Sequence, residues 1–353
     1  MGDKHVVRFE PVGIEIEVDE TQTVLRAAFD QGVMLMHGCK EGQCAACKSF
    51  LLEGDDVELD KYSTFALPDF EREEGFTLLC RAHVYEDVTI ELLQYDEEMI
   101  RSGLPVIDAE AEVVANDPVT HDLRHLVLRL VGDVDFKFFP GQYVDITVPG
   151  TDEVRSFSMA NTSARESRQL EFVIKIYPDG LFSGFLDKKL KAGDRLQVSG
   201  PFGVFTLRDA PDTDLIFVGG GAGMAPILCL LRSMAERGIE RKAVFYYGAR
   251  TRGDLCFEDE LRSLEQVLPS FRYVPALSEP TRSGQPSGDE WQGETGLITD
   301  VVSRSETGLG RAHAYICGPP PMVEAAVPLL TRLGVPEKHV YWDKFTTTGE
   351  PSP

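Results

Sequence analysis

Four cysteines near the start of the chain have the spacing of a set of metal ligands. Cys39, Cys44 and Cys47 follow a C-x4-C-x2-C pattern, and Cys80 follows after 32 intervening residues, 48–79. Three thiolates on one short loop can hold one side of a [2Fe–2S] cluster, and a fourth from a distant strand end can complete the site. The pattern therefore predicts that these four cysteines ligate a [2Fe–2S] cluster.

Two other uses of these cysteines are weaker. A structural zinc site prefers two C-x2-C clips, and this segment contains only one. A disulfide framework fits poorly with an odd total of 7 cysteines and no evident signal peptide. Because a [2Fe–2S] cluster carries one electron at a time, the remaining sequence should indicate where its electrons come from.

The length and hydropathy of the chain indicate a multidomain globular protein. Its 353 residues suffice for two or three domains, and 42% hydrophobic residues suffice for ordinary cores. No apolar run approaches the roughly 18 to 20 residues that span a bilayer. The first ten residues, MGDKHVVRFE, lack the apolar region of a signal peptide. We therefore expect a cytoplasmic protein, in a compartment that keeps cluster thiols reduced.

The charge of the chain is strongly negative and unevenly distributed. A net charge of −23 argues against nucleic acids and anionic membranes as partners. Residues 1–100 hold 23 acidic and 8 basic residues, a net of −15, whereas the remainder holds 35 and 27, a net of −8. Solubility alone could explain this asymmetry. Alternatively, the cysteine-rich region presents an acidic face that docks on a basic patch of a partner.

The elements expected around the cysteines form one small domain. Residues 1–20 alternate apolar and polar side chains around a Pro-Val-Gly turn, which predicts a β-hairpin. A short helix opened by Thr21 or Thr23 should end near Gly32. Strands are expected at 49–52 and 88–93, and the acidic stretch between them, 59–75, should be exposed. This order resembles a β-grasp ferredoxin, and a polar linker over 96–105 places the first domain at 1–102.

Two further domains follow in the predicted pattern. Residues 103–210 contain six short strands with glycine and proline punctuation, and one helix after Gly180, which predicts an antiparallel β-barrel. Residues 211–353 alternate apolar strands with helical stretches, which predicts a parallel α/β sheet with helices on both faces. The segment 279–295 has the composition of a loop.

The run Arg155-Ser156-Phe157-Ser158 ends one of the predicted barrel strands. Taken alone, it fits a polar strand edge. Together with the segments before and after it, the run resembles the flavin site of the ferredoxin-NADP⁺ reductase-like family. The resemblance implies that Arg155 pairs with a flavin phosphate, Phe157 packs on the isoalloxazine ring and Ser158 hydrogen-bonds near its N5. Phe157 stands where tyrosine is commoner, so a phenol hydrogen bond is lost.

The run Gly180-Leu181-Phe182-Ser183 begins a predicted helix. The first N–H groups of a helix and its positive dipole end can bind a phosphate. The family resemblance implies that this helix end holds the FAD pyrophosphate, with Ser183 adding a hydroxyl. An ordinary turn and helix cap is the alternative.

A glycine loop follows the first strand of the α/β region and opens a helix. Strand, glycine loop and helix together make a phosphate cradle. The loop lacks the third glycine of a Rossmann fingerprint, but it resembles the NAD(P) site of the same reductase family. A proline in the first helical turn is harmless there. The expected contacts are Gly219, Gly220, Gly221, Gly223 and Pro226.

The run Cys317-Gly318-Pro319 ends a later apolar strand. A single cysteine there is usually a packed small hydrophobe, but the run is specific to this family, where the cysteine lies beside the nicotinamide. It is not expected to act as a nucleophile, because hydride transfer is cofactor chemistry. Phe345 matches the terminal aromatic that covers the flavin ring. By resemblance, Ser158, Cys317 and Phe345 surround the reacting centre.

The choice between NADH and NADPH should be made after the second strand of the α/β region. A 2′-phosphate favours a guanidinium, whereas a free 2′-hydroxyl favours a carboxylate. Both kinds of side chain are present, as Arg250 and Arg252 against Asp254. By resemblance we expect NADH, with Arg250 contacting the adenosine or a phosphate.

The order of ferredoxin, flavin and nucleotide modules, together with the runs KEGQCAACK, EEGFTLLCR and DKF, resembles the reductase components of soluble diiron monooxygenases of the methane and propane type. The resemblance implies electron flow from NADH through FAD and [2Fe–2S] to the hydroxylase component, docked through the acidic ferredoxin domain. Reductases of Rieske ring-hydroxylating dioxygenases share these modules, and a separate carrier ferredoxin could also be the acceptor. A flavoenzyme with a small substrate of its own would need further catalytic groups, which no motif supplies.

Overall fold

The chain folds into two compact units, and each is described by itself. The computed structural model describes residues 2–38, 40–101, 103–163, 168–280 and 291–345. Unit 1 comprises residues 1–107 and 200–204, and unit 2 comprises 108–199 and 205–353. The predicted ligand Cys39 lies outside the described residues. Among the described residues, we find no helix with the length and apolar character needed to cross a membrane.

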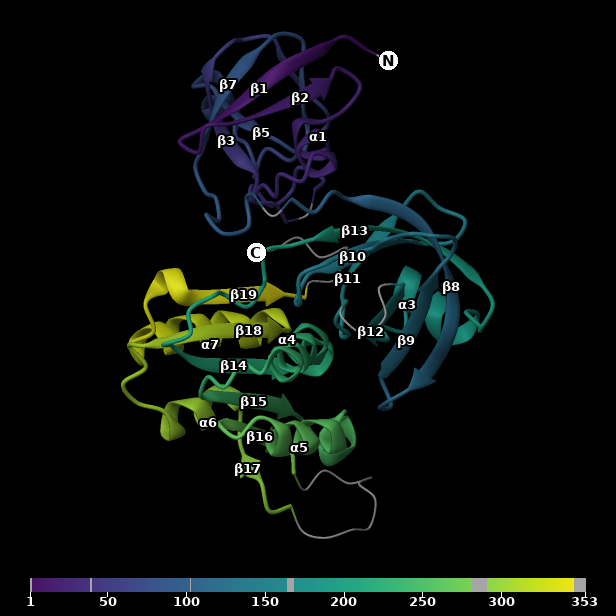
Figure 1. The fold of residues 1–353 in the computed structure, drawn as a ribbon, viewed down its shortest axis with the longest axis vertical. Coiled ribbons are helices and arrows are strands. Elements are labelled where there is room, and N and C mark those ends of the chain that lie inside the picture. Colours follow the sequence, from purple (N-terminus) through teal and green to yellow (C-terminus); the bar gives the residue numbers. More distant parts are fainter. Residues whose placement is uncertain (1, 39, 102, 164–167, 281–290, 346–353) are drawn as a thin grey trace. The chain divides into compact units, whose positions relative to one another are not determined.

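Unit 1 is built on a five-stranded sheet in the order β2-β1-β7-β3-β5 (Figure 1). β1 and β2 form the predicted hairpin, with alternate residues buried, and β1 pairs in parallel with β7. The expected strands at 49–52 and 88–93 are present. The strands are β1 (Lys4–Glu10), β2 (Ile14–Asp19), β3 (Lys48–Glu53), β5 (Phe76–Leu78) and β7 (Val88–Leu92), beside a small pair, β4 (Val57–Leu59) and β6 (Ala82–Val84).

Helix α1 (Val24–Asp30) begins where the capping chemistry predicts. Thr23 is its N-cap, and the Thr23 hydroxyl accepts a hydrogen bond from the backbone N–H of Arg26 at 3.3 Å. Such a cap satisfies one of the N–H groups that have no partner within a helix. The apolar residues of α1 are buried against the sheet.

The predicted linker at 96–105 begins as part of the core of unit 1. Met99 and Ile100 are buried, and Ile100 accepts a backbone hydrogen bond from Met34. Further along, the backbone N–H of Val106 donates to Phe29 in α1. Two buried apolar side chains and these backbone hydrogen bonds therefore attach this segment to the domain.

The barrel of unit 2 is a six-stranded sheet in the order β11-β10-β13-β8-β9-β12. A bridge between Met159 and Phe172 joins the end of β11 to β12 and closes the sheet on itself. All six predicted strands and the single helix are confirmed. They are β8 (Ile107–Pro118), β9 (Leu123–Leu130), β10 (Tyr143–Thr147), β11 (Val154–Ser158), β12 (Gln169–Lys175), β13 (Arg195–Phe202) and α3 (Leu181–Lys188).

The α/β region contains a second six-stranded sheet, in the order β17-β16-β15-β14-β18-β19, with every neighbouring pair parallel (Figure 1). The chain runs outward from β14 to β17 and then returns to β18, so the strand order reverses between β14 and β18. Ligands of such sheets bind at this switch point. The strands are β14 (Asp214–Gly220), β15 (Ala243–Ala249), β16 (Phe271–Leu277), β17 (Glu294–Thr295), β18 (Ala312–Gly318) and β19 (Val340–Lys344).

Helices cover both faces of this sheet, as predicted. Alternate residues of β14 enter two different cores, because successive side chains of a strand point to opposite faces. Leu215 and Phe217 pack with α4 (Met224–Arg237) and α5 (Glu258–Val267). Ile216 and Val218 pack with α6 (Ile298–Ser305) and α7 (Pro320–Arg332).

Several short elements were not predicted. Helix α2 (Asp69–Glu73) buries no residue, so it has no apolar period, and α6 presents only three buried residues. Strand β19 pairs with β18, but its residues are mostly half-buried and do not alternate. These elements depend on neighbouring chain segments, which a local sequence pattern does not display.

Candidate functional site

The cysteine loop is closed by the pairing of β3 with β5. Lys48 is the register partner of Leu78, and the backbone N–H of Leu79 donates to the carbonyl of Cys47 at 3.3 Å. This pairing brings Cys80 to the loop that carries Cys47. Both thiols are buried, whereas Cys44 on the loop is exposed.

The shape of the loop fits a sulfur-rich group. A Cβ at Gly38 would lie 2.9 Å from Sγ of Cys44, so only glycine leaves that thiol room. Lys40 and Ala45 adopt positive φ angles of 59° and 57°, which cost non-glycine residues about 1 to 3 kcal/mol unless the surroundings enforce them. The buried Nε–H of Arg81, next to Cys80, has no partner among the described residues, and a sulfide could accept from it. Thiolate donors with this surrounding suit a [2Fe–2S] cluster.

The predicted phosphate-binding arginine is already engaged on the barrel. Arg155 Nη1 donates to the carbonyl of Val154 at 2.8 Å, and Nη2 donates to Glu153 at 2.7 Å. Its neighbour Ser156 donates to Asp145 at 2.6 Å. A flavin phosphate would therefore have to compete with the Glu153 carboxylate for Arg155.

The two predicted flavin motifs lie side by side. The rings of Phe157, on β11, and Phe182, in α3, have centroids 4.9 Å apart. Gly180 is the N-cap of α3 and offers no side-chain cap, so the first amides of the helix have no acceptor within it. The hydroxyl of Ser183, however, exchanges hydrogen bonds of 3.1 Å with the backbone of Tyr177. Ser183 thus shapes the turn before the helix.

The glycine loop and the Cys317 run meet at the switch point of the parallel sheet. Gly219 is the register partner of Cys317. A Cβ at Gly223 would lie 2.1 Å from the carbonyl oxygen of Cys317, a distance that no side chain can adopt. A Cβ at Gly220 would approach Met322 at 3.0 Å. Pro226 lies in the first turn of α4, as expected.

Four residues from distant parts of unit 2 converge beside this loop. Cys317 is completely buried, and burial raises the pKa of its thiol well above the ordinary value, so it stays protonated. Asp343 is the register partner of Cys317 on β19. Ser158 donates to Oδ2 of Asp343 at 3.3 Å, and the backbone N–H of Phe345 donates to the carbonyl of Gly318 at 3.0 Å.

Asp343 is a site residue that sequence reasoning missed. It is partly buried, and burial raises the pKa of its carboxyl to about 6, while the hydrogen bond from Ser158 lowers it. An acidic residue inside the run V-Y-W-D-K could have been noticed as unusual in a strand. Its partner Ser158 could not have been found this way, because 185 residues separate the two.

The expected ribose-binding carboxylate is held by protein groups. Oδ2 of Asp254 accepts from the backbone N–H and the hydroxyl of Thr251, at 2.8 and 2.9 Å. Oδ1 of Asp254 lies 3.1 Å from Nδ1 of His121, a barrel residue that the sequence did not single out. Arg250 is half-exposed, and its Nη2 lies 3.8 Å from Asp122. A cluster of His121, Asp122 and Asp254 also borders a lysine, so it is no evident metal site.

Comparison with protein families matches all three regions. Residues 7–85 match the 2Fe-2S iron-sulfur cluster binding domain, 110–207 the oxidoreductase FAD-binding domain and 217–327 the oxidoreductase NAD-binding domain. The propane 2-monooxygenase reductase component of Mycolicibacterium goodii is 48% identical, over 98% of this chain and 99% of that protein. The chain belongs to the family of monooxygenase reductase components. The reductase thus carries an iron–sulfur, a FAD and an NAD domain, as predicted.

More distant relatives of the reductase align with nearly its whole length. The phenol 2-monooxygenase reductase component of Pseudomonas sp. is 36% identical, over 98% of this chain and 95% of that protein. Among solved structures, the Amycolatopsis cytochrome P450 reductase GcoB is 30% identical with a TM-score of 0.84, covering 97% of this chain and 98% of that one. The predicted fold of the reductase, with its ferredoxin, flavin-barrel and parallel α/β domains, is therefore confirmed.

Proposed function

We propose that the reductase passes electrons from NADH to the hydroxylase component of a soluble diiron monooxygenase that oxidises a small alkane such as propane. The observation that carries this proposal is the 48% identity to propane 2-monooxygenase reductase components over nearly the whole of both chains. Such a partnership places the reductase in the reducing cytoplasm, where cluster thiols persist.

The cofactor-binding residues follow from the motifs and the geometry. When bound, NADH supplies a hydride, the flavin accepts two electrons and releases them singly, and the cluster carries one. Cys39, Cys44, Cys47 and Cys80 would hold the cluster. The flavin would lie along β11 and the start of α3, and the nucleotide on the loop before α4, through the residues Arg155, Ser156, Phe157, Ser158, Gly180, Leu181, Phe182, Ser183, Gly219, Gly220, Gly221, Gly223, Pro226, Arg250, Asp254, Cys317, Gly318 and Pro319.

The chain's own groups would orient the two rings and exclude water. Ser158, held by Asp343, presents a hydroxyl at the end of β11, where the edge of the flavin would lie. Cys317, with a neutral thiol, provides a small and uncharged wall for the nicotinamide. Phe345 lies beside Gly318 and would have to move aside when nicotinamide enters.

The partner would dock through the acidic ferredoxin domain. Ser63 donates a backbone hydrogen bond of 2.9 Å to Gly42 in the cysteine loop, so the segment after it is attached directly to that loop. Two residues later, Phe65 is 95% exposed, and Phe70 in α2 is 61% exposed. Asp69, Glu71 and Glu73 surround Phe70 in the sequence. Exposed aromatic residues with a charged rim are typical of a docking surface.

Reconstitution with a purified hydroxylase tests the proposal. With the hydroxylase of a propane monooxygenase, NADH oxidation should couple to alkane oxidation, and its rate should fall about tenfold or more as salt shortens the Debye length from about 30 to about 8 Å. Phe65→Ala should slow transfer to the hydroxylase, whereas Leu93→Ala, another exposed hydrophobic change in unit 1, should not. Dye reduction should be insensitive to both changes. No coupling, or equal salt sensitivity for dye and hydroxylase, would contradict the proposal.

A further inference from the structure

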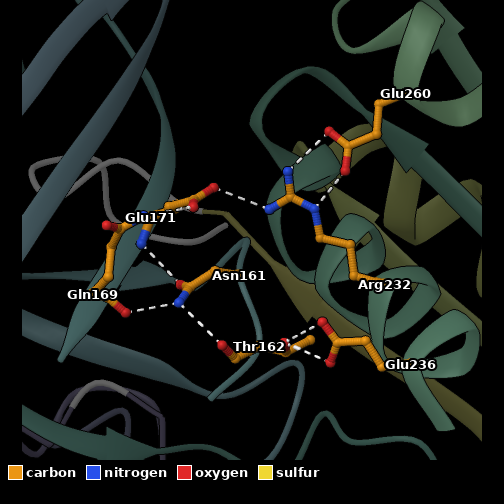
Figure 2. Close-up of a pocket in the computed structure, with 7 residues that line it drawn as sticks. All are labelled: Asn161, Thr162, Gln169, Glu171, Arg232, Glu236 and Glu260. Atoms are coloured by element: carbon orange, nitrogen blue, oxygen red, sulfur yellow. Dashed lines mark hydrogen bonds and ion pairs between the residues drawn. The ribbon is translucent and has the colours of Figure 1, made fainter. Parts of the chain in front are cut away.

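A polar cavity lies between the barrel and the helices of the α/β region, both in unit 2. Its volume is about 190 Å³, room for a few water molecules and too small for a dinucleotide. Figure 2 shows the side chains that line it pointing toward one another. They are Asn161, Thr162, Gln169 and Glu171 from the barrel, Arg232 and Glu236 from α4, and Glu260 from α5.

Arg232 stands at the centre of this cluster. Its Nε and Nη2 donate to the two oxygens of Glu260, at 2.6 and 2.9 Å, in a bidentate pair. Its Nη1 turns to the barrel, where it donates to the carbonyl of Ala160 and to Glu171, both at 3.0 Å. One planar guanidinium thus joins helices α4 and α5 to two barrel segments. Figure 2 shows its contacts with Glu260 and Glu171. A lysine, with its single charged nitrogen, cannot reproduce this fork.

Two other residues on the same face of α4 contact the same barrel segment. Cys229 donates to the carbonyl of Asn161 at 2.8 Å, and the hydroxyl of Thr162 donates to the Glu236 carboxylate at 2.9 and 2.7 Å. Positions 229, 232 and 236 share one face of a helix. Helix α4 therefore forms hydrogen bonds with three consecutive barrel residues, 160–162.

The carboxylates of this contact outnumber its one arginine, and Glu171 stays ionised near neutral pH. Burial alone would raise the pKa of Glu171, but the neighbouring His125 and Arg232 lower it to about 2. Nε2 of His125 lies 3.4 Å from Glu171 and is poorly aligned for a hydrogen bond, so the charge of Arg232 is the firmer cause. Glu171 is thus a carboxylate whenever the enzyme works, and it needs Arg232 beside it.

The two ends of this contact lead directly to the two cofactor sites. Ala160 is two residues beyond Ser158, at the end of the strand assigned to the flavin. Helix α4 starts at Met224, directly after the glycine loop assigned to the nucleotide, and Arg232 follows about two turns later. Because few residues separate Ala160 and Arg232 from these two assigned sites, a shift at Arg232 would move one ring against the other.

We infer that Arg232 is a positioning residue for hydride transfer. By clamping α4 to residues 160–162, it sets the distance between nicotinamide and flavin without touching either. The inference rests on the proposed use of NADH and FAD. A misplacement of about 1 Å can cost a reaction about a hundredfold in rate, so the clamp acts on the rate of flavin reduction more than on nucleotide affinity.

Stopped-flow reduction of the FAD-loaded enzyme by NADH tests the inference. Arg232→Gln should lower the limiting rate at saturating NADH about tenfold to a hundredfold while the Kd for NADH changes little. The long-wavelength charge-transfer absorbance of stacked nicotinamide and flavin should weaken in parallel. Arg232→Lys should recover part of the rate. Arg237→Gln, on the exposed end of the same helix, is the matched control and should behave as the wild type.

Removing one arginine leaves two carboxylates without their partner, and the variant could unfold. The double variant with Arg232→Gln and Glu260→Gln removes the repulsion between the carboxylates of Glu171 and Glu260. It should show the same loss of rate with normal FAD content. A wild-type limiting rate in either folded variant, or a loss that only follows FAD content, would overturn the inference. If the wild-type enzyme itself does not oxidise NADH, the proposed function fails, which is a separate result.

Discussion

The hydroxyl of Ser158 donates to Oδ2 of Asp343 at 3.3 Å, across the boundary between the barrel and the α/β sheet. Ser158 ends the strand β11, and Asp343 belongs to the edge strand β19. Cys317, at the end of the glycine-lined switch point, is the register partner of Asp343. One hydrogen bond therefore joins the strand assigned to the flavin to the strands that would hold the nicotinamide.

Asp343→Asn should change the pH dependence of stability. The pKa of the Asp343 carboxyl is about 6 in the folded protein, above the ordinary 3.8. Between pH 3.8 and about 6, the folded state therefore keeps a proton on Asp343 that the unfolded state has released. Stability therefore falls as pH rises through this window. Asparagine carries no charge, so the variant should be more stable than the wild type by about 1 to 3 kcal/mol at pH 8 and similar below pH 4.

Urea denaturation of both proteins at several pH values measures this difference. Lys344→Gln, one residue further along the strand, is a control. The ion pair that it removes involves Glu324, whose side chain is exposed to solvent. A stability difference that does not vary with pH would show that burial does not raise the pKa of Asp343.

Ser158→Ala should slow flavin reduction. The change removes the hydroxyl that Asp343 holds in place, and the loss of one hydrogen bond in the reacting complex is worth about tenfold in rate. FAD content should remain normal, because Ser158 is one of many expected flavin contacts. Stopped-flow reduction by NADH gives the rate, with the exposed Ser270→Ala as control. An unchanged rate would remove Ser158 from the site.

Gly223→Ala should damage the nucleotide loop. The added Cβ would lie 2.1 Å from the carbonyl oxygen of Cys317, and backbone on both sides must shift to relieve the clash. Such overpacking costs about 1 to 3 kcal/mol or more, and the displaced loop should bind NADH poorly. Gly253→Ala is the matched control, since its nearest neighbour would be 3.8 Å away. Thermal denaturation measures the stability of each variant, and NADH titration measures its affinity for the nucleotide. Equal results for Gly223→Ala and Gly253→Ala would contradict this prediction.

Cys80→Ser should remove the cluster while leaving flavin reduction intact. Without the fourth thiolate the [2Fe–2S] site is incomplete, so iron content and visible absorbance should fall and transfer to one-electron acceptors should stop. NADH should still reduce the flavin in the other unit. Cys256→Ser, a change at a buried cysteine in the α/β region, should keep the cluster. Two irons per chain retained in Cys80→Ser would overturn the ligand assignment.

We expect the reductase to prefer NADH over NADPH. Asp254 is held beside the expected ribose site by Thr251 and His121, and its negative charge opposes a 2′-phosphate. Nη2 of Arg250 lies near Asp122, and the side chain of Arg250 is only half-exposed. An incoming phosphate would therefore reach only part of it. The ratio of kcat/KM for the two nucleotides measures the preference, and Asp254→Asn should narrow it. A higher kcat/KM for NADPH would mean that the arginines dominate this site.

Local spacing in the sequence was enough to determine the modules and to nominate most of the candidate site residues, whose roles stay predictions. The cysteine pattern, the glycine loop and the Cys317 run are each short, and their chemistry depends on residues a few positions apart. The barrel strands were equally readable, because alternation and glycine punctuation are local properties. Short elements such as α2 and β19 were missed, since little or no apolar period marks them.

The tertiary structure alone decided which groups meet. Ser158 and Asp343 are 185 residues apart, and Arg232 reaches Ala160 and Glu260, which are 72 and 28 residues away. In the structure, Ser183 also hydrogen-bonds the backbone of Tyr177, and Thr251 and His121 hold Asp254. A side chain with several possible acceptors takes the one that folding brings within about 3 Å. That outcome depends on how distant strands and helices pack, which no local pattern encodes.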